Sequence, residues 1–236
     1  MRGKSKPQPA LPAVVFHSVP GMLARSLVVF FANFGFIGAV TLAAYAPLKL
    51  VVFSICGIAG VSPGGVASSV IRDLSDGISA SLVAPAIIYG IVARLRGGKS
   101  PSAGDCLRRA RGLWWPTLWN DLKAQITVGL SLLLLVVPGV IQAVRLAFVE
   151  QVVALEPDNR SVVFARSREI AAGHGWKILF ACIPAVVVNF LSEWLLFSLM
   201  EKLGLSWPVA AFVDCGLALA GQWSTVLFTL IYLALI

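Results

Sequence analysis

Charged residues are scarce in this chain, and long stretches contain none. Asp, Glu, Lys and Arg make up 13% of its 236 residues, about half the share in a soluble protein. Six long stretches carry no charge at all: 26–48, 50–71, 77–93, 124–144, 178–192 and 215–236. A helix needs about 20 mostly apolar residues to cross a bilayer core of about 30 Å. These gaps in charge exclude a water-soluble globular protein and predict an all-α, polytopic transmembrane bundle.

The chain also has few histidines and no closely spaced cysteine pair, which limits the metal sites and catalytic sites that it could form. The chain has two histidines and four cysteines, with neither HExxH nor CxxC spacing. Cys56, Cys182 and Cys215 lie in apolar surroundings, where cysteine packs as a small hydrophobe. No serine stands in a GxSxG pattern, and Gly98-Lys99-Ser100 lacks the upstream glycine of a phosphate-binding loop. We therefore expect no catalytic residues, no metal and no cofactor, and a protein that is not an enzyme.

The polar intervals are short, so there is no second domain. None is long enough to bury a core of its own. Residues 1–20 contain Arg2, Lys4, Lys6 and prolines, and this composition predicts a disordered basic arm. We expect residues 21–236 to form a single transmembrane domain.

Six spans account best for the apolar stretches. The first is expected to be one long helix, bent near Pro47, whose Lys49 reaches toward the headgroups. Pro138-Gly139 leaves two interpretations open: a single span over 124–144, or the tip of a helical hairpin, which proline and glycine favour. With the hairpin, the spans are about 26–57, 77–93, 117–137, 140–155, 176–199 and 208–235.

The basic residues give this topology an orientation. With both termini inside, the inner segments hold fourteen of the nineteen Lys and Arg residues, as the positive-inside rule requires. The net charge of +8 is thus explained by topology rather than by nucleic-acid binding. We expect a multi-pass protein of the bacterial cytoplasmic (inner) membrane with both termini in the cytoplasm.

Two inner loops contain similar amphipathic segments, 57 residues apart. At this offset Arg109 meets Arg166, Arg111 meets Arg168 and Trp119 meets Trp176. The basic residues lie on one helical face: Arg108, Arg109, Arg111, Arg166 and Arg168. The opposite faces are formed by Cys106, Leu107, Ala110, Leu113 and Trp114, and by Val163, Phe164, Ser167, Ile170 and Ala171. The pattern predicts two cytoplasmic-side interfacial helices whose arginines contact anionic lipids; it fits either an internal duplication or two unrelated basic connectors.

Four ionisable residues fall at membrane depth: Arg145, Glu150, Glu193 and Asp214. Such residues usually face the bundle interior and pair with one another. In the six-span topology Arg145, Glu193 and Asp214 share the outer half, so an Arg145–Glu193 or Arg145–Asp214 pair is expected. Either the cluster is a structural ion pair, or Arg145 binds a lipid headgroup or solute anion.

One region resembles a known family. Val137-Pro138-Gly139 begins a segment with a single arginine, followed by Val152–Glu156, Ala165–Glu169 and Gly173–Lys177. This pattern is similar to the membrane domain attached to some bacterial glycerophosphoryl diester phosphodiesterases, which also occurs alone in small six-helix proteins. The catalytic barrel of those enzymes is absent here. The resemblance therefore implies the fold and a membrane-lipid context, and no hydrolytic activity.

The leading functional hypothesis is a non-enzymatic accessory or scaffold protein of the inner membrane that contacts anionic lipids. The first alternative is a transporter or lipid-handling protein with a site near Arg145. The second is a structural subunit of a larger membrane complex, for which an exposed small-residue helix face would be the mark. The expected partners are membrane lipids and other membrane subunits, not nucleic acid.

Overall fold

Every regular element that the structure describes is a helix. The computed structural model describes residues 18–61, 66–97, 100–156, 162–203 and 207–236. Its ten helices are α1 (Val19–Ala32), α2 (Phe34–Ile58), α3 (Val66–Leu95), α4 (Ala103–Arg111), α5 (Trp114–Leu134), α6 (Val136–Arg145), α7 (Val149–Leu155), α8 (Val163–Ala171), α9 (Gly175–Leu203) and α10 (Trp207–Leu235). The predicted fold class is confirmed. Residues 1–17 of the expected disordered arm lie outside the described part, and Ser18 already caps α1.

Five helical segments are long and apolar enough to cross a membrane. They are Phe34–Ile58, Ser69–Leu95, Val136–Leu155, Gly175–Leu195 and Ala211–Leu235. The third predicted span, α5, is not among them because its first half carries Asn120, Asp121, Lys123 and Gln125. Five spans are therefore clear by length and composition, and α5 is the candidate for a sixth.

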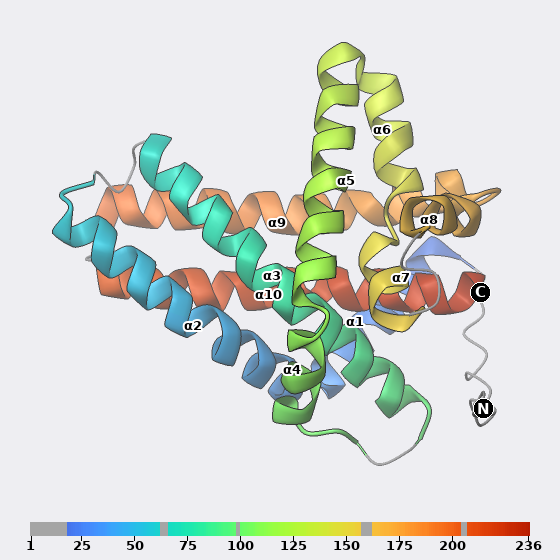
Figure 1. Cartoon of the computed structure of the whole chain (residues 1–236), viewed down its shortest axis with the longest axis horizontal. Helices are drawn as coiled ribbons and strands as arrows, with labels where there is room; N and C mark the ends of the chain where they lie inside the picture. The colour runs from blue at the N-terminus through green and yellow to red at the C-terminus, as the bar shows by residue number, and fades with distance from the viewer. Residues whose placement is uncertain (1–17, 62–65, 98–99, 157–161, 204–206) are drawn as a thin grey trace, which may run out of the picture.

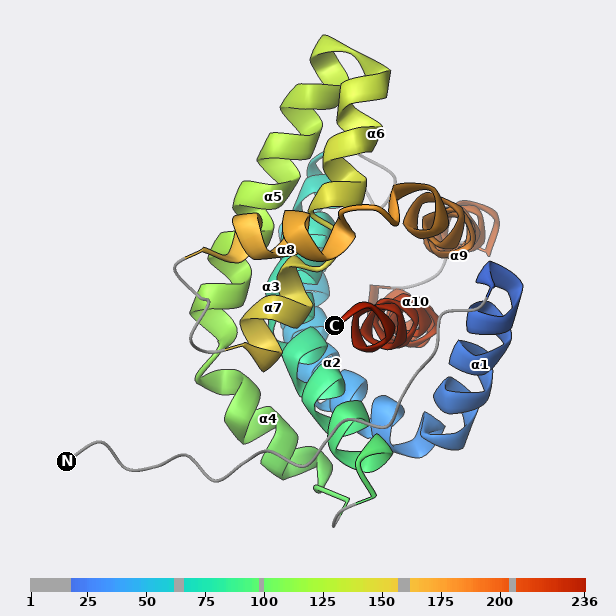
Figure 2. The same cartoon turned by 90° about the vertical axis from the view of Figure 1, so that its right-hand side faces the viewer.

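Helix α10 occupies the centre of the molecule. Seen end-on, it lies beside α9 and α1, with α2 and α3 on its other side (Figure 2). Val226, Leu227, Leu230 and Ile231 of α10 are fully buried. The indole N–H of Trp223 donates to the hydroxyl of Ser26 over 2.8 Å and joins α10 to α1. The uncharged C-terminal stretch thus forms the core around which the other helices pack.

The first helical break lies at Asn33, not at Pro47. The side-chain amide of Asn33 donates to the carbonyl of Val29, and α1 ends there, since asparagine competes with the helix for backbone hydrogen bonds. Its amide oxygen accepts from Arg94 over 3.4 Å, which ties the break to the end of α3. Helix α2 then continues through Pro47. The expected single helix over 26–57 is therefore wrong: α1 and α2 are separate.

Helices α5 and α6 form the predicted hairpin, but its tip lies at Leu135 rather than at Pro138-Gly139. Pro138 lies in the first turn of α6, where a missing N–H costs nothing. The hairpin runs across the direction of α9 and α10 in both views (Figures 1 and 2). Its apolar tip, including Leu133, Leu134 and Val137, is exposed on the protein surface. The hairpin therefore stands apart from the parallel arrangement expected of six packed spans.

The amphipathic helices α4 and α8 have their apolar sides covered by protein. At the offset of 57 residues the buried positions coincide: Cys106 with Val163, Ala110 with Ser167, and Leu113 with Ile170. We expected these faces to contact lipid. Instead they pack against the protein core, because α4 contacts α2 and α3, and α8 contacts α6, α7 and α10. The helices that follow diverge, since α5 enters the hairpin and α9 enters the long bundle (Figure 1).

Gly139 provides a test of the hairpin. A Cβ at this position would lie 2.4 Å from the Leu132 side chain and 2.8 Å from its Cα. We expect Gly139→Ala to lower stability by about 1–3 kcal/mol, because backbone cannot move aside as a side chain can. Gly129→Ala on α5 has open space around it and serves as the control; helix propensity favours it by up to about 1 kcal/mol. Unfolding in detergent micelles, followed by circular dichroism, measures both; equal effects would contradict the close α5–α6 contact.

Candidate functional site: an acidic cavity inside the bundle

A buried lysine pairs with two aspartates at the centre of the bundle. The side chain of Lys49 on α2 is completely buried, and its ammonium lies 2.6 Å from the carboxylate of Asp76 on α3. It also forms an ion pair with Asp214 on α10, whose side chain is only 10% exposed. Three long helices therefore meet at one ammonium group. The expectation that Lys49 extends toward the headgroups is wrong, because its side chain is buried and its ammonium pairs with Asp76 and Asp214.

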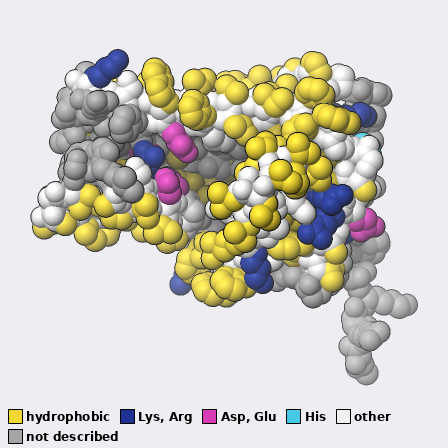
Figure 3. Space-filling view, turned by 90° about the horizontal axis from the view of Figure 1, so that it is seen from above, with side chains coloured by type: hydrophobic (Ala, Val, Ile, Leu, Met, Phe, Trp, Pro, Cys, Tyr) yellow, Lys and Arg dark blue, Asp and Glu magenta, His cyan; other side chains and the backbone are white. Residues whose placement is uncertain are grey.

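These two aspartates line a large polar cavity. The cavity has a volume of about 470 Å³ and is bounded by α2, α3, α5, α9, α10 and the segment 146–151. Its polar lining comprises Tyr45, Arg72, Asp76, Asp121, Gln125, Glu150, Gln151, Asn189, Ser192, Glu193, Asp214, Gln222, Ser224 and Thr225. Figure 3 shows a hollow on this side of the molecule, bordered by acidic and basic side chains. The volume is in the usual range of about 300–1,000 Å³ for small-molecule sites.

Carboxyl groups dominate the charge of this lining. Five of the lining residues are Asp or Glu, and one, Arg72, is basic. Lys49 neutralises only part of this charge, since Asp121, Glu150 and Glu193 form no ion pair with any described residue. Carboxylates in such a lining favour cations over anions when they are ionised.

The break between α6 and α7 shapes one wall of the cavity. Residues 146–148 are not helical, and the hydroxyl of Ser167 bridges this gap from α8. It donates to the carbonyl of Arg145 over 2.9 Å and accepts from the N–H of Phe148 at 3.2 Å. Ser167, on the apolar face of its helix, thus satisfies two backbone groups that the break leaves without helical partners.

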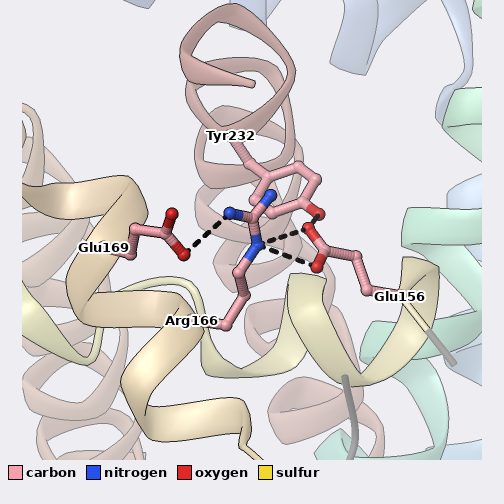
Figure 4. A network of polar contacts seen from close by, with 4 residues as sticks. All are labelled: Glu156, Arg166, Glu169 and Tyr232. Atoms are coloured by element: carbon pink, nitrogen blue, oxygen red, sulfur yellow. Dashed lines mark hydrogen bonds and ion pairs between the residues drawn. The ribbon is translucent and has the colours of Figure 1, made fainter. Parts of the chain in front are cut away.

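A second polar network holds α7 against α8 and α10 (Figure 4). The guanidinium Nε of Arg166 donates to both oxygens of Glu156, at 2.9 and 3.2 Å, and its Nη1 donates to Glu169 at 2.9 Å. The hydroxyl of Tyr232 donates to Glu156 over 2.5 Å. These hydrogen bonds, those to Glu156 first, raise the pKa of Arg166 above its ordinary value. Arg166 is therefore committed to protein contacts rather than free to bind lipid.

The predicted intramembrane cluster is only partly brought together. Glu150, Glu193 and Asp214 line the same cavity, whereas Arg145 is not among the lining residues. The side chain of Arg145 is exposed and forms no ion pair within the described part of the chain. Helix α6 ends at Arg145, and the chain turns so that this side chain faces outward. The cation that pairs with Asp214 is Lys49, and the expected pairing with Arg145 does not form.

The predicted lipid-contacting arginines fall into two groups. Arg108, Arg109, Arg111 and Arg168 are exposed, although Arg109 stacks on the ring of Tyr89 and Arg108 lies 3.4 Å from Asp105. Arg166 belongs to the network with Glu156. Arg108 and Arg111 also border a second, largely apolar groove of about 540 Å³ between α2, α3 and α4.

Sequence reasoning missed Lys49 and Asp76 as partners in one site. Lys49 is the only charged residue between positions 26 and 71, and an isolated cation in such a stretch needs a counter-charge. The predicted second span begins at residue 77 and so leaves Asp76 outside it, but α3 begins at Val66. The isolation of Lys49 was the signal that could have identified the pair.

Comparisons with protein-family models, curated proteins and solved structures find no match. The resemblance to the phosphodiesterase membrane domain therefore stays a prediction, and the function rests on the geometry described above.

The ion pair at Lys49 can be tested by substitution. Lys49→Met should lower the free energy of unfolding by about 3–5 kcal/mol, because it leaves Asp76 and Asp214 without their counter-charge. Adding Asp76→Asn and Asp214→Asn should recover part of this loss. Lys123→Met is the control, since Lys123 is exposed beside Trp119. Chemical unfolding in detergent micelles is the measurement; equal losses from both lysine variants would contradict a structural role for Lys49.

Proposed function

We propose that this protein binds a small cationic solute in its acidic cavity and serves the transfer of that solute across the membrane. The excess of carboxyl groups in the lining carries this proposal. Ionisable side chains are costly in a bilayer and usually mark a substrate or ion pathway. A purely structural bundle has no need of a polar cavity of this size.

The scaffold hypothesis and the transporter hypothesis make different demands on the interior. A scaffold requires packed helices and an exposed contact face, whereas a transporter requires a polar binding site within the bundle. The lining of Asp76, Glu150 and Asp214 supports the second. The site differs from the one expected near Arg145, and so does the sign of its ligand: the lining favours a cation, not an anion.

The proposal includes an orientation in the inner membrane. Basic residues gather at the end of α3, on α4 and α8, and at the start of α9. They include Arg94, Arg96 and Lys177. The positive-inside rule then places the end of α10 in the cytoplasm. Glu193, Arg72 and Asp214 belong to helix portions nearer the opposite ends, so the cavity would receive its solute from the outer side.

A binding assay with simple ions tests this proposal. Tetramethylammonium should raise the unfolding temperature of the detergent-purified protein, whereas acetate at equal ionic strength should not. Glu193→Gln should weaken tetramethylammonium binding about fivefold, as expected for the loss of about 1 kcal/mol from an exposed charge. Asp105→Asn makes the same change of charge on an exposed residue of α4 outside the lining and should leave binding unchanged. No cation response, or an equal response to acetate, would refute the proposal.

A second proposal concerns lipid. The apolar groove is lined by Ala43, Ala44, Leu48, Ile78, Leu82, Leu107 and Trp114, with Arg108 and Arg111 at its border. This combination fits one acyl chain of an anionic phospholipid, with its phosphate beside the two guanidinium groups. The observation supports lipid contact by α4 specifically, rather than by all five predicted arginines.

Native mass spectrometry tests the lipid proposal. Replacing both Arg108 and Arg111 with Gln should lower affinity for anionic phospholipid more than about tenfold, since each basic residue contributes about 1 kcal/mol. Arg25→Gln, an exposed change on α1 outside the groove, should retain lipid. Arg166→Gln should instead lower stability, because it breaks the contacts with Glu156. Unchanged lipid retention in the double variant would contradict the proposal.

A further inference from the structure

The ammonium group of Lys49 is surrounded by groups that attract a cation. The carboxylate of Asp76 lies 2.6 Å from its nitrogen, and the carboxylate of Asp214 forms a second ion pair with it. The ring of Phe53 adds a third contact, with its centroid 5.6 Å from the nitrogen, because the face of an aromatic ring also attracts positive charge. The Lys49 side chain is completely buried, so these protein groups, rather than water, surround its charge.

Two carboxylates share this single ammonium, so one negative charge remains when all three groups are ionised. The three side chains are not equally open: that of Lys49 is 0% exposed, that of Asp214 10% and that of Asp76 36%. Both aspartates line the cavity, whereas Lys49 is not among its lining residues. A solute in the cavity therefore contacts the carboxylates and not the ammonium, which acts on the solute only through its charge.

Arg72, the basic residue of the lining, is less closely tied to the two aspartates. It lies one turn before Asp76 on α3, but its guanidinium is 3.8 Å from Asp73, which is outside the lining. The Arg72 side chain is 17% exposed, so solvent screens part of its charge. Lys49 is the buried cation that directly contacts both cavity aspartates, and its charge therefore has the stronger effect on them.

We propose that Lys49 makes the cavity select monovalent over divalent cations. The inference rests on the proposed function and specifies the charge of its solute. The attraction of an ion to a charged site rises in proportion to the charge of the ion, whereas the cost of removing its water rises with the square of that charge. Lys49 leaves one negative charge on the pair of Asp76 and Asp214, which offsets the lost hydration of a monovalent cation better than that of a divalent one.

Without Lys49, the same two carboxylates would suit a divalent ion. Asp76 and Asp214 approach one point from α3 and α10, and magnesium is commonly bound by one or two carboxylates together with water. The ammonium of Lys49 occupies this point and repels a further positive charge. Lys49 thus keeps the pair from acting as a divalent-ion site while leaving Asp76 open to the cavity.

Two cations, tetramethylammonium and magnesium, test this role by isothermal titration of the intact protein in detergent. The parent should bind tetramethylammonium at least about tenfold more tightly than magnesium. Lys49→Met removes the charge and keeps the length of the side chain. It should raise the affinity for tetramethylammonium about tenfold and that for magnesium about a hundredfold, because the same change in potential acts on one charge or on two. A purely structural role predicts the opposite sign, since damage to the cavity weakens the binding of both ions.

The same comparison in the Asp214→Asn background keeps the test valid if Lys49→Met fails to fold. The double variant leaves only Asp76 without its counter-charge, and that carboxylate is partly exposed. Adding Lys49→Met to Asp214→Asn should again raise both affinities, that for magnesium by the square of the factor for tetramethylammonium. Lys177→Met is the control, since Lys177 is exposed at the start of α9 outside the lining, and it should leave both affinities unchanged.

The outcomes separate this inference from the proposed function. If the parent binds magnesium as tightly as tetramethylammonium, the inference is refuted while the acidic-cavity proposal stands. The same holds if removing Lys49 lowers both affinities, leaves them unchanged or raises them by one common factor. If the parent does not bind tetramethylammonium, both proposals fail.

Discussion

The ion pair of Lys49 with Asp76 and Asp214 is the interaction on which the arrangement of the bundle depends. Desolvating a charge costs several kcal/mol, and only well-placed counter-charges offset it. The single ammonium therefore requires α2, α3 and α10 to approach at one point. Because Asp76 and Asp214 also line the cavity, the same contact positions three of its walls and determines part of its charge.

The remaining walls depend on how the α5–α6 hairpin leaves the bundle. The chain turns out of α6 at residues 146–148, where Ser167 satisfies the freed backbone groups, and Arg166, Glu156 and Tyr232 anchor α7 beside α8 and α10. This turn brings Glu150 and Gln151 into the cavity and directs Arg145 away from it. The cavity thus lies where the hairpin meets the long helices.

Features with a local cause were predicted well. A hairpin was expected from Pro138 and Gly139 and is present, although its tip lies at Leu135. The buried faces of α4 and α8 were expected from the helical period, including the matching of Ala110 with Ser167. The partners of the charged residues were not. Arg145 was expected to pair with Asp214 because both fall in the outer half of a parallel bundle. That reasoning gives the depth of each residue in the membrane, but not the side of its helix on which the side chain lies.

By itself, the sequence determined that this is a helical membrane protein, because uncharged apolar stretches of this length are stable only in a bilayer. It also singled out Glu150, Glu193 and Asp214 as ionisable residues of the bundle interior, although Lys49 was not among the residues it singled out. Only the tertiary structure decided which carboxylates pair with Lys49 and which remain open to the cavity. Those choices depend on helix rotation and crossing, which arise from packing between segments far apart in the chain.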